Sequence, residues 1–119
     1  MAKILIVDDS TFERKTVGDM LRRSGYADVV EAEDGERGIE AFDREKPDLV
    51  LLDIRMPGLS GVEVLQKIIQ KSPSAKVVMV SIVRDQASID ECLKLGAKGY
   101  VNKPVTTDKL LPHVKSLIG

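Results

Sequence analysis

Acidic residues directly follow two of the most apolar stretches of the chain. Asp8 and Asp9 come after the run Ile4–Val7, and Asp53 comes after Leu49–Leu52. Three carboxylates held within a few ångströms repel one another, by roughly 4 kcal/mol per pair at ~4 Å and an effective dielectric constant near 20. Such a cluster raises a pKa or binds a cation, and hard oxygen ligands favour Mg²⁺, Mn²⁺ or Ca²⁺ over Zn²⁺. The sequence therefore indicates a divalent metal site if the fold brings these residues together.

A hydroxyl and an amine stand at the ends of two further apolar stretches. Ser81 ends the run Lys76–Ser81, and Lys103 follows Gly99–Asn102 and precedes Pro104. A lysine amine and a serine hydroxyl both suit an anion on the far side of a metal ion. Carboxylates accept phosphoryl groups as aspartyl phosphates, and that transfer needs mainly in-line positioning and neutralisation of charge. The whole set predicts a metal ion, a phosphoryl group and one aspartate as nucleophile.

The elements that must position these residues alternate between two kinds of apolar pattern. Short apolar runs predict strands buried on both faces, and the segments between them have helical spacing of apolar residues. The alternation predicts a parallel sheet with helices on both faces and right-handed crossovers. We expect a flavodoxin-like, doubly wound α/β fold, (βα)5, and adopt the common five-strand order 2-1-3-4-5. The predicted strands are Lys3–Val7, Asp28–Ala32, Asp48–Asp53, Lys76–Ser81 and Gly99–Asn102.

That fold predicts where the polar strand-end residues meet. In doubly wound sheets, ligands bind beyond the carboxyl ends of the strands, at the switch point between strands 1 and 3. Asp8, Asp9, Asp53, Ser81 and Lys103 would converge there from four different strands.

Local signals mark the helix boundaries. Ser10 with Glu13, and Ser60 with Glu63, fit capping boxes at the starts of two helices. The last helix is expected to begin near residues 107–108, which places Pro112 beyond its first turn. Proline there removes a backbone hydrogen bond, so we expect this helix either to start late or to kink.

Composition narrows the class of protein. The 119 residues include 18 Lys and Arg against 19 Asp and Glu, and the net charge of −1 provides no strong field for nucleic acid or an anionic membrane. No apolar run approaches the ~18–20 residues of a membrane span. Cys92 is the single cysteine, so no internal disulfide forms, and we expect it in the core; His113 is expected to be solvated. We expect one domain over 1–119, with no output domain, in the cytoplasm.

Five ordered motifs carry a resemblance to a known family. The sequence resembles, over its whole length, the receiver domain of two-component response regulators. The matching segments are Ile6–Ser10, Asp48–Gly61, Ser81 at its strand end, Gly96–Tyr100 and Lys103–Pro104. Each motif alone is weak, and their joint order at predicted strand ends is a strong signal.

The resemblance implies roles for the site residues. Asp53 is similar to the phosphoacceptor, and Lys103 to the phosphate-binding lysine, with a cis bond before Pro104. The cofactor would be Mg²⁺ or Mn²⁺. The implied ligands of that metal are Asp8 through a water molecule, Asp9, Asp53 and the backbone carbonyl of Arg55.

The resemblance also implies a switch and partners. Ser81 and Tyr100 are similar to the pair that moves on phosphorylation and remodels the face made by helix 4, strand 5 and helix 5. A sensor histidine kinase or phosphotransfer protein would supply the phosphoryl group, and an output protein would recognise the changed face. The protein would be a monomer or a phosphorylation-dependent dimer, and would catalyse only its own phosphorylation and dephosphorylation. Surface residues suited to partner choice are Thr11, Arg14, Arg84, Gln86 and Lys94.

Several positions depart from the family or vary within it. Ile82 follows Ser81 where a small residue is usual, so its bulk would narrow access to the site; Val105 stands where phenylalanine is common. Arg55 and Val83 occupy positions thought to tune the lifetime of the phosphate. The alternative to a working receiver is therefore a phosphorylation-deficient scaffold or dimerisation module.

Two other classes fit less well. A phosphatase with an aspartate nucleophile would place its second acid where Ser10 stands. A flavin-binding module would need a phosphate-binding loop rich in Gly, Ser and Thr after the first strand, and none is present.

Overall fold

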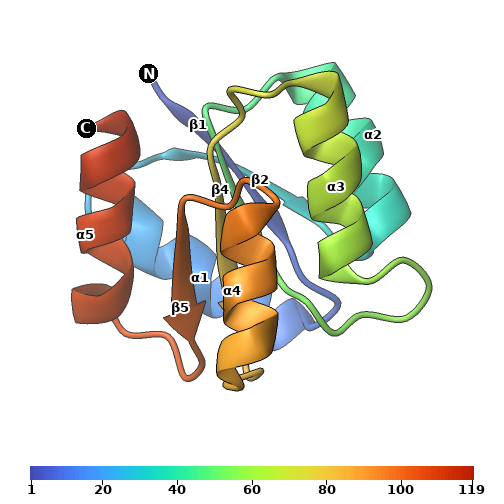
Figure 1. Cartoon of the computed structure of the whole chain (residues 1–119). Coiled ribbons are helices and arrows are strands. Elements are labelled where there is room, and N and C mark those ends of the chain that lie inside the picture. Colours follow the sequence, from blue (N-terminus) through green and yellow to red (C-terminus); the bar gives the residue numbers. More distant parts are fainter.

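Five strands and five helices alternate along the chain in a computed structural model that describes residues 1–119 (Figure 1). The strands are all parallel and have the order β2-β1-β3-β4-β5, which confirms the predicted fold class and topology. The strands are β1 (Lys3–Val7), β2 (Asp28–Ala32), β3 (Leu49–Leu52), β4 (Val77–Ser81) and β5 (Gly99–Asn102). The helices are α1 (Thr11–Arg23), α2 (Gly35–Glu45), α3 (Gly61–Lys71), α4 (Gln86–Lys94) and α5 (Thr107–Ile118).

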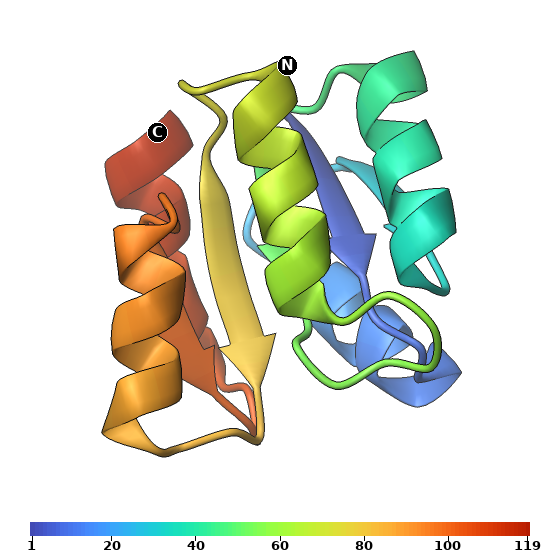
Figure 2. The same cartoon turned by 45° about the vertical axis from the view of Figure 1, so that its right-hand side comes forward.

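Helices cover both faces of the sheet and divide the core into two halves. Apolar residues of α2, α3 and α4 pack with one set of strand residues, and those of α1 and α5 pack with the alternating set. In β3, Val50 and Leu52 belong to the first half and Leu49 and Leu51 to the second. Figure 2 shows α3 and α4 in front of the sheet, with α1 and α5 behind it. Two covered faces explain why the strands are continuous apolar runs.

The register of the central strands places the predicted site residues side by side. Val7 of β1 pairs with Leu52 of β3, so the residues that follow, Asp8 and Asp53, leave the sheet at the same level. The backbone N–H of Asp53 donates to the carbonyl of Val7 at 3.0 Å, which extends the sheet pairing into the site. Both chain termini lie at the opposite end of the molecule (Figure 1).

The C-terminal helix confirms one expectation and corrects another. α5 begins at Thr107, as expected, with Thr106 as its cap and Pro112 inside it, so of the two alternatives for Pro112 the late start is wrong. The proline leaves the carbonyl of Asp108 without its helical donor, and that residue is exposed to water. His113 is half-buried rather than solvated: a Cβ atom added at Gly99 would lie 2.6 Å from its Nδ1, so its ring packs against the strand.

One of the two predicted capping boxes forms completely. Ser60 and Glu63 exchange both hydrogen bonds at the start of α3. At α1, the Ser10 hydroxyl accepts from the Glu13 amide, but the Ser10 amide donates to Asp8 Oδ1 at 2.9 Å instead of to Glu13. The second half of that box is therefore replaced by a contact that anchors a predicted metal ligand.

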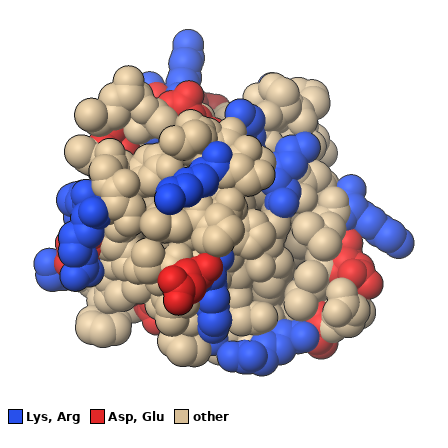
Figure 3. Space-filling model, turned by 90° about the vertical axis from the view of Figure 1, so that its left-hand side faces the viewer, with Lys and Arg blue, Asp and Glu red and all other residues tan.

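Charged side chains of both signs lie on the face of the molecule that includes α5 (Figure 3). Lys, Arg, Asp and Glu side chains are interspersed on the face that includes α5, without one continuous patch of either sign (Figure 3). None of the helices combines the length and apolar character that crossing a membrane requires.

Candidate metal and phosphoryl site

The three predicted acidic ligands meet at the carboxyl ends of β1 and β3. Asp8, Asp9 and Asp53 each offer a carboxylate oxygen, and these oxygens all lie within 4.8 Å of one another. Asp8 and Asp53 are buried, whereas Asp9 is exposed, so the cluster is open to solvent on one side. An all-oxygen set with an open side suits Mg²⁺, which keeps several of its water molecules. The residues present therefore fit the divalent metal expected here.

Every polar group of Asp8 makes a hydrogen bond with another part of the protein. Its amide donates to the carbonyl of Ala32 at 3.1 Å, and its Oδ1 accepts from the Ser10 amide at 2.9 Å. Its Oδ2 accepts from the Lys103 amine at 2.8 Å, and its backbone carbonyl accepts from Arg14 at 2.6 Å. This carboxylate is held in one orientation before any metal binds.

Asp53 sits in a less favourable environment for a charged carboxyl. Its Oδ1 accepts from the Ile54 amide at 2.8 Å, and its Oδ2 lies 3.5 Å from Lys103 Nζ. Burial, followed by the negative charge of Asp8, raises the pKa of Asp53, and the charge of Lys103 offsets only part of that rise. A carboxylate destabilised in this way gains from a divalent cation or from conversion to an acyl phosphate.

Lys103 is the positive group of the site. Its side chain is only 10% exposed, and burial alone would lower the pKa of its amine. The hydrogen bond to Asp8 and the negative charges of Asp53 and Asp8 outweigh burial, so the pKa of Lys103 is raised and the amine stays charged. The bond between Lys103 and Pro104 is cis, as expected from the family resemblance.

Gly61 allows the start of α3 to lie directly against the backbone of Asp53 and Ile54. The Gly61 amide donates to the carbonyl of Ile54 at 2.7 Å. A Cβ atom at Gly61 would lie 1.9 Å from the backbone oxygen of Asp53 and 2.6 Å from the Ile54 Cα. Only glycine allows the start of α3 to approach the strand end this closely.

The two expected switch residues are joined through Val83. The Ser81 hydroxyl oxygen, fully buried, accepts from the Val83 amide at 3.2 Å. The carbonyl of Val83 accepts from the Tyr100 hydroxyl at 2.5 Å and from the Asn102 side chain at 3.2 Å. Tyr100 is half-buried, and burial raises the pKa of its hydroxyl. The sequence did not indicate the role of Asn102, because an asparagine at a strand end has many ordinary uses.

The residues that depart from the family pattern lie in different surroundings. Ile82 is 57% exposed, whereas Val83 and Val105 are buried. Arg55 is exposed in the loop after β3, and its carbonyl accepts no hydrogen bond from the protein. That oxygen is therefore free to act as a ligand.

Arg14 and Arg84 support the site, although the sequence suggested them as partner-choosing surface residues. The Arg14 side chain is 11% exposed and contacts the backbone of Asp8. Arg84 is exposed and donates to the backbone carbonyl of Lys103 at 2.9 Å. Both contacts are made to backbone carbonyls, which side-chain types in a sequence do not reveal.

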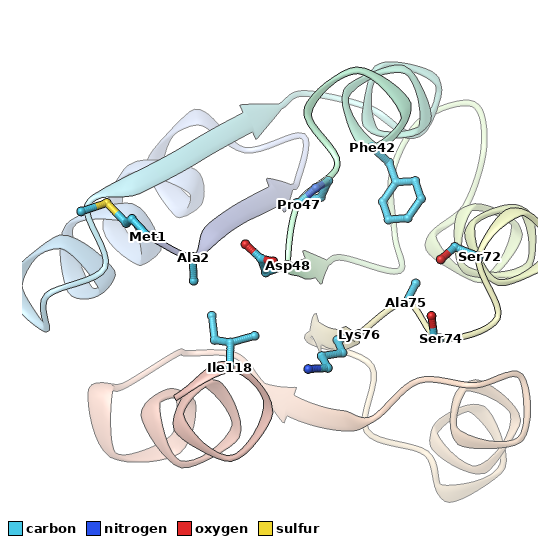
Figure 4. Close-up of a pocket in the computed structure, with 10 residues that line it drawn as sticks. All are labelled: Met1, Ala2, Phe42, Pro47, Asp48, Ser72, Ser74, Ala75, Lys76 and Ile118. Carbon is cyan, nitrogen blue, oxygen red and sulfur yellow. The ribbon is translucent and has the colours of Figure 1, made fainter.

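A separate cavity lies at the opposite end of the sheet. It has a volume of about 570 Å³, and its lining includes Met1, Phe42, Asp48 and Lys76 (Figure 4). Asp48 accepts from the backbone amide of Lys3, and the Lys76 amine donates to a backbone carbonyl of α5. The side chain of Asp48 and that of Lys76 are thus already hydrogen-bonded to the backbone, and this cavity lies apart from the residues at the carboxyl ends.

The fold and the site together define a class of protein: a doubly wound α/β domain with an acidic cluster and a paired lysine at its switch point. The chain belongs to the response regulator receiver domain family, which it matches over residues 4–115. It is 41% identical over 111 residues to the chemotaxis protein CheY of Listeria monocytogenes, covering 93% of each chain. It is 38% identical over 107 residues to a cyclic di-GMP phosphodiesterase of Thermotoga maritima, covering 90% of this chain and 28% of that protein.

A solved structure agrees in fold. The CheX–CheY–BeF3–Mg complex from Borrelia burgdorferi superimposes with a TM-score of 0.94 at 32% identity, covering 99% of this chain and 90% of that chain. The chain is thus a receiver domain of CheY type, in a family of signalling proteins rather than conventional enzymes. Receiver domains bind Mg²⁺, in agreement with the acidic cluster found here.

Proposed function

We propose that Asp53 accepts a phosphoryl group from a histidine kinase or phosphotransfer protein, with Mg²⁺ bound by the acidic cluster. The observation that supports this most directly is the position of the Asp53 carboxylate. The carboxylate groups of Asp8 and Asp9 lie near it and complete an acidic set that fits a metal ion. The Lys103 ammonium group lies 3.5 Å from its Oδ2. The proposed metal ligands are Asp8 through water, Asp9, Asp53 and the carbonyl of Arg55.

The transfer step follows from these charges. A carboxylate oxygen of Asp53 attacks phosphorus, the N–P bond of the donor phosphohistidine breaks, and the imidazole leaves with the electron pair of that bond. Three carboxylates would repel the incoming phosphoryl group, and one lysine leaves an excess of negative charge. Mg²⁺, when bound, neutralises that excess and orients the phosphoryl oxygens. Lys103 stays charged and supplies a donor for those oxygens.

Switching would start at Ser81. In this structure the Ser81 hydroxyl oxygen accepts from the amide of Val83, whose carbonyl accepts from Tyr100. Movement of the hydroxyl toward a phosphoryl group would release the Val83 amide and disturb the residue that anchors the tyrosine. The change would then reach α4, β5 and α5, where an output protein would bind. This is a shift between two packings, biased by the new charge.

Intact mass after incubation with acetyl phosphate and Mg²⁺ tests the phosphorylation. We expect one phosphoryl adduct on the wild-type protein, and none on Asp53→Asn or in the presence of a chelator. An adduct on Asp53→Asn would show that another residue is the acceptor. No adduct under any condition would favour the scaffold or dimerisation alternative.

Hydrogen exchange tests the switch separately. We expect beryllofluoride and Mg²⁺ to change amide exchange in α4 and β5, and Ser81→Ala to reduce that change while the acceptor still binds beryllofluoride. Exchange changes confined to the loops around Asp53 would contradict the switch but leave the acceptor role intact.

A further inference from the structure

We propose that Arg14 is a positioning residue for the metal site: its guanidinium group fixes the peptide between Asp8 and Asp9, and thereby directs the Asp9 carboxylate. The inference rests on the proposed metal-dependent function and deepens it. It assigns a role to a side chain that neither binds the metal nor touches the phosphoryl group.

The guanidinium group of Arg14 joins three elements. Nη1 donates to the backbone carbonyl of Asp8 at 2.6 Å, at the end of β1. Nε donates to Glu31 Oε1 of β2 at 3.0 Å, and Nη2 donates to the Thr11 hydroxyl of α1 at 3.2 Å. The Arg14 side chain is 11% exposed, so this geometry is held by packing as well as by hydrogen bonds.

The contact with the Asp8 carbonyl matters because of what Asp9 lacks. The peptide unit is planar, so fixing the Asp8 carbonyl also fixes the N–H and Cα of Asp9. Asp9 is exposed, and its carboxylate makes no hydrogen bond or ion pair with any other residue. Its direction toward the cluster is therefore set by the position of its backbone and by its own rotamer, because no other side chain holds it. Asp8, in contrast, has side-chain contacts of its own with Ser10 and Lys103.

An electrostatic role and a positioning role of Arg14 predict opposite changes in Mg²⁺ affinity when Arg14 is replaced. Removing a positive charge near three carboxylates strengthens the attraction for a cation, so a purely electrostatic role predicts tighter Mg²⁺ binding. Losing the fixed peptide lets the exposed Asp9 turn away from the cluster, so a positioning role predicts weaker binding. Removing a group that orients a metal ligand typically weakens affinity ten- to one hundredfold.

Calorimetric titration of the unphosphorylated protein with MgCl₂ distinguishes these roles. We expect Arg14→Met to weaken Mg²⁺ binding about tenfold. Lys15→Met is the matched control, because it removes the same charge from the next residue, whose side chain is 75% exposed. We expect that control to bind as tightly as the wild type or slightly tighter. Arg14→Lys keeps the charge but loses the forked donor geometry, and should also bind more weakly than the wild type.

A second variant keeps the proposal testable if Arg14→Met does not fold. Glu31→Gln leaves Arg14 in place and weakens only its hold on β2; we expect Mg²⁺ binding to weaken by a smaller factor. Equal or tighter binding by folded Arg14→Met, or weakening by Lys15→Met to the same extent, would overturn the positioning role. Failure of the wild type to bind Mg²⁺ at all would instead overturn the proposed metal-dependent function.

Discussion

Lys103 and Asp8 form an ion pair of 2.8 Å at the carboxyl ends of the strands, although they lie 95 positions apart in the sequence. The same amine lies farther, 3.5 Å, from Asp53. The lysine therefore acts first as an internal cation for the acidic cluster. A metal ion at this site and the Lys103 amine would both compensate the negative charges of Asp8 and Asp53.

Replacing Lys103 with methionine should destabilise the metal-free protein. Removing one partner of a buried pair leaves an uncompensated charge, at a cost of about 3 kcal/mol. We expect that loss in the free energy of urea unfolding measured with a chelator, and partial recovery in Mg²⁺. Lys71→Met removes an exposed pair with Asp43 and should cost no more than about 1 kcal/mol. Equal losses in the two variants would contradict the buried role of Lys103.

Replacing Asp53 with asparagine should stabilise the metal-free protein at neutral pH. The pKa of Asp53 is raised above its ordinary value of 3.8, so the folded state holds this proton more tightly than the unfolded state. Protonated Asp53 therefore stabilises the folded state at pH values below 3.8. This contribution to the free energy of unfolding is lost as the pH rises through the raised pKa of Asp53.

The difference between the two proteins therefore depends on pH. We expect the free energy of unfolding of Asp53→Asn to exceed that of the wild type at pH 7, and this gain to vanish as the pH falls below the ordinary aspartate pKa of 3.8. Asparagine retains an oxygen that can accept from the Ile54 amide, so that hydrogen bond is kept. A constant gain at every pH would show that ionisation of Asp53 is not its cause.

Gly61→Ala tests the close approach of α3 to the acceptor strand. The added methyl group would lie 1.9 Å from the Asp53 carbonyl oxygen, and backbone atoms must move to admit it. We expect a loss of more than about 2 kcal/mol in the free energy of unfolding, together with weaker Mg²⁺ binding. Gly18→Ala, inside α1 and facing only the flexible end of Arg22, should instead be neutral or stabilising. A mild effect of Gly61→Ala would contradict the described packing.

Ile82→Ala tests whether this side chain limits access to the site. Ile82 follows Ser81 and is 57% exposed, so its truncation should change the free energy of unfolding by no more than about 0.5 kcal/mol. We expect a two- to fivefold faster reaction with acetyl phosphate, roughly 0.4–1 kcal/mol in the barrier. An unchanged rate would mean that the side chain stands clear of the path of a small donor.

The sequence was sufficient for the sheet and for the residues at its carboxyl ends. The apolar runs Ile4–Val7 and Leu49–Leu52 are followed by Asp8 and Asp53, so they define two strands together with their polar ends. Parallel pairing then places those ends together, and the order of strands and the cis bond before Pro104 agree with the resemblance.

The sequence was insufficient where a side chain binds a backbone atom. The sequence suggested Arg14 and Arg84 only as surface residues suited to partner choice, because each contacts the site through a backbone carbonyl, which every residue has. The Ser10 amide had two acceptors within reach, and only the structure shows that it donates to Asp8 rather than to Glu13. Pro112 suggested a late or bent helix, because its position alone does not reveal that the carbonyl it orphans is exposed.

Mapping the phosphorylated residue tests the central claim most directly. The protein is treated with acetyl phosphate and Mg²⁺, the acyl phosphate is reduced with borohydride, and the modified residue is found by peptide mass spectrometry. Our account predicts homoserine at Asp53 alone, absent when Mg²⁺ is chelated. Reduction at Asp8 or Asp9, or an adduct that forms equally well without metal, would contradict it.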